Sequence, residues 1–281
     1  MGIEPELIKF RSESLRYYID APLWNGRRCA AIGEMNLTNA DDGIKVLEQV
    51  IQRAKEDGVE AVLGPMNGDT WHAYRSVLES DGSAPFMLEP VSGPHDLACL
   101  RAAGFEAVSH YVSTRGKLER ALGPEPIKVP GVEIAAWDSE NTEDLIANLY
   151  GMSKASFAKN NFYKPITLND FQALYRPLLG AIDPRFVLIA KTGSGTICGF
   201  LFGFPDGSAP ADNSTVILKT YASGMHGVGH ALADRFHRNA IEMGFNSVIH
   251  ALMHEDNISL KRSEQHKAGV FRRYVLLAKI L

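Results

Sequence analysis

The pattern of apolar and polar positions is clearest in the C-terminal third of the chain. Apolar runs at residues 216–218 and 248–252 predict two buried strands, and the segment between them predicts a long helix. A glycine-rich turn at residues 223–229 opens directly into that helix. This order predicts a compact β–α–β unit, followed by Asn257 and another helix at 259–268.

The same order is predicted a second time near the N-terminus. A strand at 29–33 and a strand at 59–63 flank an amphipathic helix at 41–57, for which Asn39 or Asp41 is the expected cap. Asn67 follows the second strand, as Asn257 does in the C-terminal copy. A helix and a tyrosine-bearing strand come next in both copies, with Tyr111 in the first and Tyr274 in the second. We therefore infer an internal duplication.

The remaining segments complete two domains. Residues 5–23 mix charges with aromatic side chains and predict a short helix, and residues 116–131 have the charge, proline and glycine content of a linker. Further predicted elements are a strand at 132–137, helices at 142–157 and 168–179, a strand pair at 186–191 and 196–204, and a strand at 214–221. The expected boundaries are an N-terminal domain at 1–118, a linker at 119–130 and a C-terminal domain at 131–281.

Composition narrows the classes of protein. The chain of 281 residues is 45% hydrophobic and 22% charged, with a net charge of −4, which is typical of a globular protein. This mild acidity gives no reason to expect nucleic acid as a partner. No apolar run is long enough to span a membrane, and no signal-peptide core is present, so we expect a cytoplasmic protein. The cysteines (Cys29, Cys99 and Cys198) have apolar neighbours, which predicts reduced, packed thiols.

The glycine-rich turn is the strongest candidate for a binding site. The first turn of a helix has unpaired N–H groups and a partial positive charge, both of which attract phosphate. Glycines allow a bulky diphosphate to approach the main chain. The turn is equally compatible with a purely structural role, because many helices begin with glycine.

The order of strands, turn and helices resembles the GNAT family of N-acetyltransferases. In that family the loop between the fourth strand and third helix reads Arg/Gln-x-x-Gly-x-Gly/Ala. Gly227, Val228 and Gly229 match its second half, whereas Gly224 stands at the Arg/Gln position. The resemblance covers residues 130–281 well and residues 25–118 in part. It implies an α/β (α+β) fold of two tandem domains, each with a mixed, mostly antiparallel sheet flanked by helices.

The resemblance also implies acetyl-CoA as co-substrate and direct attack by an amine in a ternary complex. The main chain of Tyr221, Ala222 and Ser223 would contact the acetyl carbonyl and the pantetheine arm. The resemblance places the pyrophosphate on the main-chain N–H groups of the residues from Met225 to Ala231. The expected cofactor-binding set is Tyr221, Ala222, Ser223, Gly224, Met225, His226, Gly227, Val228, Gly229, His230, Ala231 and Asn257.

Individual side chains keep alternative interpretations. Asn257 matches the family's pantetheine-binding asparagine and is also a favoured helix N-cap. His254 or Glu255 is the candidate general base, and a solvent-exposed loop histidine is the alternative for His254. Many family members have a tyrosine about two turns past the asparagine, and this chain does not. Ser263, acting through water, and Tyr274 are therefore the candidates for protonating the leaving thiolate. No histidine pair completes a metal site, and we expect none.

The two copies differ in the loop that enters the helix. In the first copy, Asp41 and Asp42 would repel a diphosphate, which predicts a scaffold without cofactor. The expected function is acetylation of a small-molecule amine, bound partly by residues 153–166. The same residues are equally compatible with a packed helix end and a loop. The alternatives are a non-catalytic acyl-CoA binder or sensor and a fold that has lost its ligand. A homodimer through an exposed sheet edge is compatible with the sequence.

Overall fold

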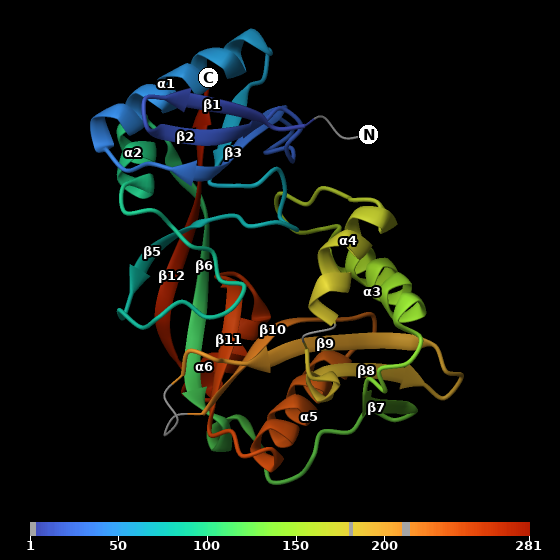
Figure 1. The fold of residues 1–281 in the computed structure, drawn as a ribbon. Helices are drawn as coiled ribbons and strands as arrows, with labels where there is room; N and C mark the ends of the chain where they lie inside the picture. Colours follow the sequence, from blue (N-terminus) through green and yellow to red (C-terminus); the bar gives the residue numbers. More distant parts are fainter. Residues whose placement is uncertain (1–3, 180–181, 210–213) are drawn as a thin grey trace. The chain divides into compact units, whose positions relative to one another are not determined.

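The computed structural model describes residues 4–179, 182–209 and 214–281 (Figure 1). Contacts divide the chain into two compact units. The N-terminal unit contains the chain up to Tyr111, together with Lys159–Lys164 and Arg272–Leu281. The C-terminal unit contains Val112–Ala158 and Pro165–Phe271. These units differ from the contiguous domains expected at 1–118 and 131–281, because two long strands, β6 (Glu106–Lys117) and β12 (Gly269–Ile280), each cross the boundary.

The N-terminal unit has the strand order β1-β2-β3-β4-β12. Its own strands are β1 (Glu6–Phe10), β2 (Glu13–Tyr18), β3 (Cys29–Asn36) and β4 (Ala61–Gly64), and β5 (Ser76–Ser80) pairs with β12. β3 and β4 are parallel, whereas β1, β2 and β3 form an antiparallel meander.

The helix predicted within residues 5–23 is wrong, because this segment forms the β1–β2 hairpin. Along β2, Leu15 and Tyr17 are buried at 0% and 2% exposure, while Arg16 and Tyr18 between them are less buried. The polar–apolar alternation therefore follows the period of two that a half-buried strand requires.

Helices α1 (Ala40–Glu56) and α2 (Asp96–Ala102) cover the N-terminal unit's sheet. The expected cap at Asn39 is confirmed, since its side chain accepts a hydrogen bond from the N–H of Asp42 at 3.1 Å. The buried face of α1, including Val46, Leu47 and Val50, packs into the same hydrophobic cluster as Ile32. Burial of this apolar face is what stabilises the helix on the sheet.

The C-terminal unit has the strand order β6-β11-β10-β9-β8-β7. The strands that follow β6 are β7 (Val132–Ala136), β8 (Val187–Thr192), β9 (Ile197–Pro205), β10 (Thr215–Ser223) and β11 (Ser247–His254). β7 to β10 are antiparallel, and β10 and β11 form the parallel pair predicted for the β–α–β unit. The expected fold class, a mixed and mostly antiparallel sheet flanked by helices, is confirmed.

Helices lie on both faces of this sheet (Figure 1). α5 (Val228–Glu242) packs on one face, where Phe236 joins the cluster of β8, β9 and β10 side chains. α3 (Thr142–Phe157) contributes Leu145 to a separate cluster with Phe200 and Ala222. α3 and α4 (Leu168–Leu179) have the bounds that the sequence predicted. A short 3-10 helix, η1 (Leu118–Ala121), follows β6, and another, η2 (Pro184–Phe186), precedes β8.

The expected linker at 119–130 is partly ordered structure. β6 continues to Lys117, and Leu118 and Ala121 of η1 are buried at 0% and 6% exposure. Leu118 also donates its N–H to the carbonyl of Asn246 at 3.0 Å. The charge and proline content of this segment predicted a linker, although two of its apolar residues are buried.

The element order repeats within the chain. The first copy runs β1-β2-β3-α1-β4-α2-β6, and the second runs β8-β9-β10-α5-β11-α6-β12, where α6 is Ile258–Gln265. The structure therefore contains the duplication that the sequence predicted, with β5 as an addition to the first copy. Both copies place a helix N-terminus after the third strand of a meander.

Candidate functional site

The candidate site lies where β10 and β11 separate in the C-terminal unit. The two strands pair in parallel from Thr215 opposite Ser247 to Leu218 opposite His250. Beyond that point β10 continues to pair with β9 as far as Ser223. One extra residue on β10 shifts the β9 register between Leu218 and Thr220, which makes a β-bulge and bends the strand. The carboxyl end of β10 is thus free of its parallel neighbour.

The glycine-rich turn joins this end of β10 to α5. Gly227 is the N-cap of α5 and has a φ of 82°, a left-handed conformation that favours glycine. A Cβ at Gly229 would lie 3.1 Å from the ring of Tyr221 and 3.2 Å from Ser223 Oγ, so glycine keeps the main chain close to β10. A Cβ at Gly224 would meet no heavy atom within 4 Å.

The first turn of α5 presents main-chain N–H groups beside this opening. The N–H groups of the first helical positions have no acceptor within the helix. The N-cap Gly227 has no side chain to supply one, and His226 and Met225 before it are exposed. His230 is half-buried, and burial lowers its pKa. Val228 and Ala231 are buried, so their side chains anchor the turn to the sheet.

The opposite wall of the opening is the start of α6. Asn257 is the N-cap of α6, and its side-chain oxygen accepts the N–H of Ser259 at 2.9 Å. The hydroxyl of Ser259 lies 2.6 Å from the hydroxyl of Tyr221 on β10. A direct hydrogen bond therefore connects the side chains of β10 and α6.

His254 is the last residue of β11, and Glu255 follows it directly. His254 Nδ1 accepts a hydrogen bond from the N–H of Asp256 at 3.1 Å, which places the neutral ring's proton on Nε2. Glu255 is exposed to solvent. For His254 to take a proton at Nδ1, its bond to Asp256 has to open first.

Ser263 is not at this opening but inside the unit. It is 1% exposed and lies 2.6 Å from His250 Nδ1 and 2.5 Å from the hydroxyl of Thr114. His250 Nε2 in turn lies 3.0 Å from His237 Nε2. These four side chains form a buried hydrogen-bonded chain that connects β6, α6, β11 and α5.

Both histidines of this chain are held neutral by burial. Burial lowers the pKa of His237 well below its usual range, and His250 adds a repulsive contribution. Burial, followed by repulsion from His266, lowers the pKa of His250 to about 4. With two neutral rings, one Nε2 donates and the other accepts across the pair.

Tyr274 belongs to the N-terminal unit. It is fully buried, and its hydroxyl donates to the carboxylate of Glu89, which also pairs with the buried guanidinium of Arg272. The structure therefore places Tyr274 in a buried ion-pair network, whereas His254, Glu255 and the glycine-rich turn share the C-terminal unit.

The corresponding position in the first copy is filled by protein side chains. β3 and β4 pair in parallel only as far as Ala31 and Leu63, and an extra residue shifts the β2–β3 register just beyond. Asn67 Oδ1 accepts the N–H of Glu34 at 3.0 Å, and the N–H of Met66 donates to the carbonyl of Ile32, so the segment after β4 stays on β3. A Cβ at Gly33 would lie only 2.1 Å from Asn67 Oδ1, so glycine makes room for the amide.

A carboxylate covers the N-terminus of α1. Glu13 is fully buried and accepts hydrogen bonds from the hydroxyl of Thr38 at 2.7 Å, from the N–H of Thr38 and from the N–H of Asn39 at 3.3 Å. Together with a bond from Ser12, these donors lower the pKa of Glu13 to about 2, the Thr38 hydroxyl contributing most. Asp42, expected to repel a diphosphate, is paired with Arg11 and Lys45.

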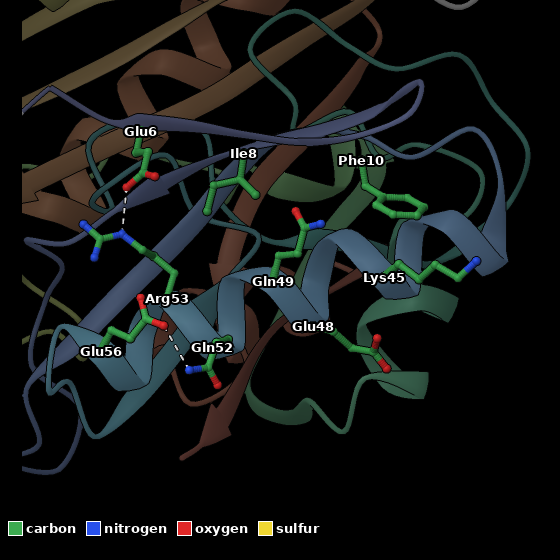
Figure 2. Close-up of a pocket in the computed structure, with 9 residues that line it drawn as sticks. All are labelled: Glu6, Ile8, Phe10, Lys45, Glu48, Gln49, Gln52, Arg53 and Glu56. Atoms are coloured by element: carbon green, nitrogen blue, oxygen red, sulfur yellow. Dashed lines mark hydrogen bonds and ion pairs between the residues drawn. The ribbon is translucent and has the colours of Figure 1, made fainter.

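A surface groove of 580 Å³ lies in the N-terminal unit between β1 and α1 (Figure 2). Ile8 and Phe10 line it from the strand, and polar side chains of α1 line it from the helix. Arg53 pairs with Glu6 across the groove at 2.9 Å. Gln52 also donates to Glu56 at 3.0 Å along the same wall.

In residues 4–179, 182–209 and 214–281, no group of three or more His, Cys, Asp or Glu side chains is placed to hold a metal ion. Within the same described part of the chain, no helix is both long and apolar enough to cross a membrane. Cys29, Cys99 and Cys198 are buried free thiols, and burial raises the pKa of each.

The sequence did not single out the side-chain contacts of Tyr221, Ser259, Glu13 and His237. Only His237 had a usable signal, because it shares the apolar face of α5 with Ala240 and Phe236. The other contacts join residues that are distant in sequence, so their spacing carries no signal.

Comparison with solved structures identifies the fold. A GCN5-related N-acetyltransferase from Sphaerobacter thermophilus aligns with 96% of this chain and 76% of its own, at a TM-score of 0.57 and 13% identity. A tandem GNAT protein from the clavulanic acid biosynthesis pathway aligns with 100% of this chain and 84% of its own, at a TM-score of 0.57 and 13% identity. A GCN5-related N-acetyltransferase from Anabaena variabilis aligns with 95% of this chain and 59% of its own, at a TM-score of 0.54 and 11% identity.

Sequence comparison gives no match to any protein-family model. It gives no match to a curated protein either. The structural likeness confirms the tandem GNAT fold that the sequence pattern predicted.

Proposed function

We propose that the chain is an N-acetyltransferase that uses acetyl-CoA and acetylates the amine of a small molecule. The observation that carries this proposal is the separation of β10 from β11 directly beside the glycine-capped N-terminus of α5. An opening of this kind offers main-chain groups to an extended ligand and N–H groups to its anionic end. The tandem GNAT fold supports acyl transfer as the reaction class.

The ligand-binding roles follow from this geometry. We assign the pyrophosphate to the N–H groups within Met225–Ala231 other than those of Val228 and Ala231, which donate to the carbonyls of Met225 and Gly227. Gly227 and Gly229 allow close approach to this turn. The free edge of β10 at Tyr221 to Ser223 binds the pantetheine arm and orients the acetyl carbonyl. Asn257 has its oxygen on Ser259, so its side-chain N–H₂ is the group we assign to the arm.

Acetyl-CoA supplies an activated thioester when it is bound. The protein has to orient the amine, remove a proton from it and exclude water. We assign proton removal to His254, acting through Nδ1 after its bond to Asp256 opens, with Glu255 as the alternative base. Ser263 is committed to His250 and Thr114 inside the unit, so we assign it a role in holding α6 rather than in proton transfer.

We propose that the first copy is a scaffold that binds no cofactor. Glu13 supplies a carboxylate to the N-terminus of α1, and Asn67 supplies an amide oxygen to the bulge of β3. These two groups stand where the anionic end and a carbonyl of a cofactor would otherwise bind.

A second candidate is a non-catalytic acyl-CoA binder, which Gly224 favours because it offers no side chain to a phosphate. Turnover separates the two. The purified chain is incubated with acetyl-CoA and a panel of small amines, and free thiol release is measured against a no-amine control. Amine-dependent release that His254→Ala lowers at least tenfold supports the transferase. If the chain binds acetyl-CoA but no amine in the panel causes thiol release, the result supports the non-catalytic binder.

A further inference from the structure

The side chains of Tyr221 and Ser259 meet across the opening between β10 and α6. Their hydroxyl oxygens are 2.6 Å apart, which is a short hydrogen bond for two hydroxyls. Tyr221 lies near the carboxyl end of β10, beyond the last residue that pairs with β11. Ser259 is the second residue of α6, which begins shortly after β11 ends. The bond therefore joins the two walls of the opening.

The ring of Tyr221 also contacts the first turn of α5. A Cβ at Gly229 would lie 3.1 Å from Cε2 and 3.4 Å from Cδ2 of this ring, so the ring rests on the main chain of the turn. An extended ligand with its anionic end on this turn and its other end at the separated strands has to pass the same ring. The ring and the ligand compete for this space.

We propose that Tyr221 and Ser259 form a clasp that closes the opening and that the cofactor has to break. This inference rests on the proposed function, because it assumes that acetyl-CoA binds between β10 and α6. The conformational change required is small, since it involves one hydrogen bond and rotation of one half-buried ring. Opening exposes two hydroxyls, so part of the binding free energy is used to separate them.

The clasp makes a definite prediction for binding kinetics. Removing either hydroxyl abolishes the same bond, so Tyr221→Phe and Ser259→Ala should each raise the association rate for CoA and tighten its Kd by about three- to tenfold. The double variant should bind no tighter than the better single variant, because the two changes remove one shared interaction. Association rates are measured by stopped flow and Kd by calorimetry on the full chain.

Tyr150→Phe is the matched control. It removes a tyrosine hydroxyl in the same unit that donates to the carbonyl of Ile166 at 2.9 Å and takes no part in the bond between Tyr221 and Ser259. Its Kd for CoA should equal that of the wild type. Thermal unfolding of every variant confirms that the chains are folded.

Each result decides the proposal. Faster and tighter binding in both single variants, without further gain in the double, supports the clasp. If wild type binds CoA and the single variants bind with unchanged or weaker affinity, the clasp is wrong; weaker binding would make the two hydroxyls cofactor ligands. If neither the wild type nor any variant binds CoA, the proposed function fails and the clasp fails with it. Binding that appears only in the variants would support a tightly closed clasp.

Discussion

Glu13 accepts a hydrogen bond from the hydroxyl of Thr38 at 2.7 Å, and its carboxylate also receives the N–H groups that precede α1. Glu13 comes immediately before Ser14 on β2, whose partner is the last residue of β3. In the second copy, Cys198 comes immediately before Gly199 on β9, whose partner is the last residue of β10. A carboxylate in one copy thus corresponds in register to a neutral thiol in the other.

Replacing Glu13 tests its role in the first copy. Glu13→Gln keeps the size of the side chain but loses the charge and one acceptor, so the thermal midpoint at pH 7 should fall. The folded pKa of Glu13 is lowered from 4.5 to about 2. Its stabilising contribution is therefore complete above pH 4.5 and is lost as the pH falls toward 2.

The measurement is the difference in thermal midpoint between wild type and Glu13→Gln at a series of pH values. The difference should be constant above pH 5 and smaller at pH 3.5. Ser12→Ala, which removes only the neighbouring hydroxyl at 2.7 Å, should cost less. A midpoint for Glu13→Gln equal to wild type at pH 7 would show that the carboxylate does not stabilise α1.

Introducing a carboxylate at Cys198 should prevent CoA from binding at the N-terminus of α5 in the second copy. Cys198 is buried in the hydrophobic cluster that includes Val228, the first residue of α5. We expect Cys198→Glu to weaken CoA binding at least tenfold, because its charge repels the pyrophosphate and competes for the N–H groups of α5. Cys198→Ser is the control of similar size and should bind within about twofold of wild type. Thermal unfolding separates loss of the site from loss of the fold, and a folded Cys198→Glu with unchanged affinity would contradict the assignment.

Gly224 allows a gain of affinity. A Cβ at this position meets no heavy atom within 4 Å, so a side chain can start here without displacing a neighbour. Gly224→Arg should tighten CoA binding by about three- to tenfold at low salt, since a charge-assisted hydrogen bond to phosphate contributes about 1.5–3 kcal/mol before solvent screening. Gly224→Glu is the charge-reversed control and should weaken binding. If both variants bind CoA with equal affinity, the pyrophosphate does not bind at this turn.

The buried histidines should make the C-terminal unit sensitive to acid. The folded pKa of His250 is about 4, below its usual 6.5, so the unfolded chain binds the proton first as the pH falls. Stability should be constant above pH 6.5 and fall between pH 6.5 and 4, by about 3 kcal/mol for a shift of this size. His237 is shifted in the same direction and adds to the loss.

The test is the pH dependence of the thermal midpoint. In a His237→Leu, His250→Leu double variant the midpoint should vary less between pH 6.5 and 4 than in wild type. His226→Leu, which alters an exposed histidine, should keep the wild-type slope. If the thermal midpoint of the double variant falls with pH as much as that of the wild type, groups other than these two histidines cause the loss of stability.

Local sequence signals predicted the elements that have strong periodicity. α3 and α4 have the predicted bounds, and Asn39 caps α1, because helical spacing and capping are set by neighbouring residues. The β1–β2 hairpin was missed, because only β2 alternates with a period of two, whereas β1 places two apolar residues, Leu7 and Ile8, in succession. Each of β6 and β12 has residues in both units. This division depends on tertiary packing, and the composition of the linker segment could not predict it.

The candidate site was predicted as a backbone feature only. The glycines and the change from strand to helix are local, so the turn at Gly227 and Gly229 was recognisable. The partners of Tyr221 and Glu13 are 38 and 25 residues away along the chain, and no periodicity connects them. Tyr274 and Ser263 were chosen for their chemistry, whereas their burial beside Glu89 and His250 is a consequence of the fold.

The central claim is that one copy of the duplicated fold binds acetyl-CoA and the other is occupied by its own side chains. Titration calorimetry of acetyl-CoA into the full chain tests this directly. The account predicts one equivalent bound per chain with micromolar Kd, unchanged in stoichiometry in Glu13→Gln and weakened in Cys198→Glu. Two equivalents in the wild type, or no binding at millimolar acetyl-CoA, would contradict it.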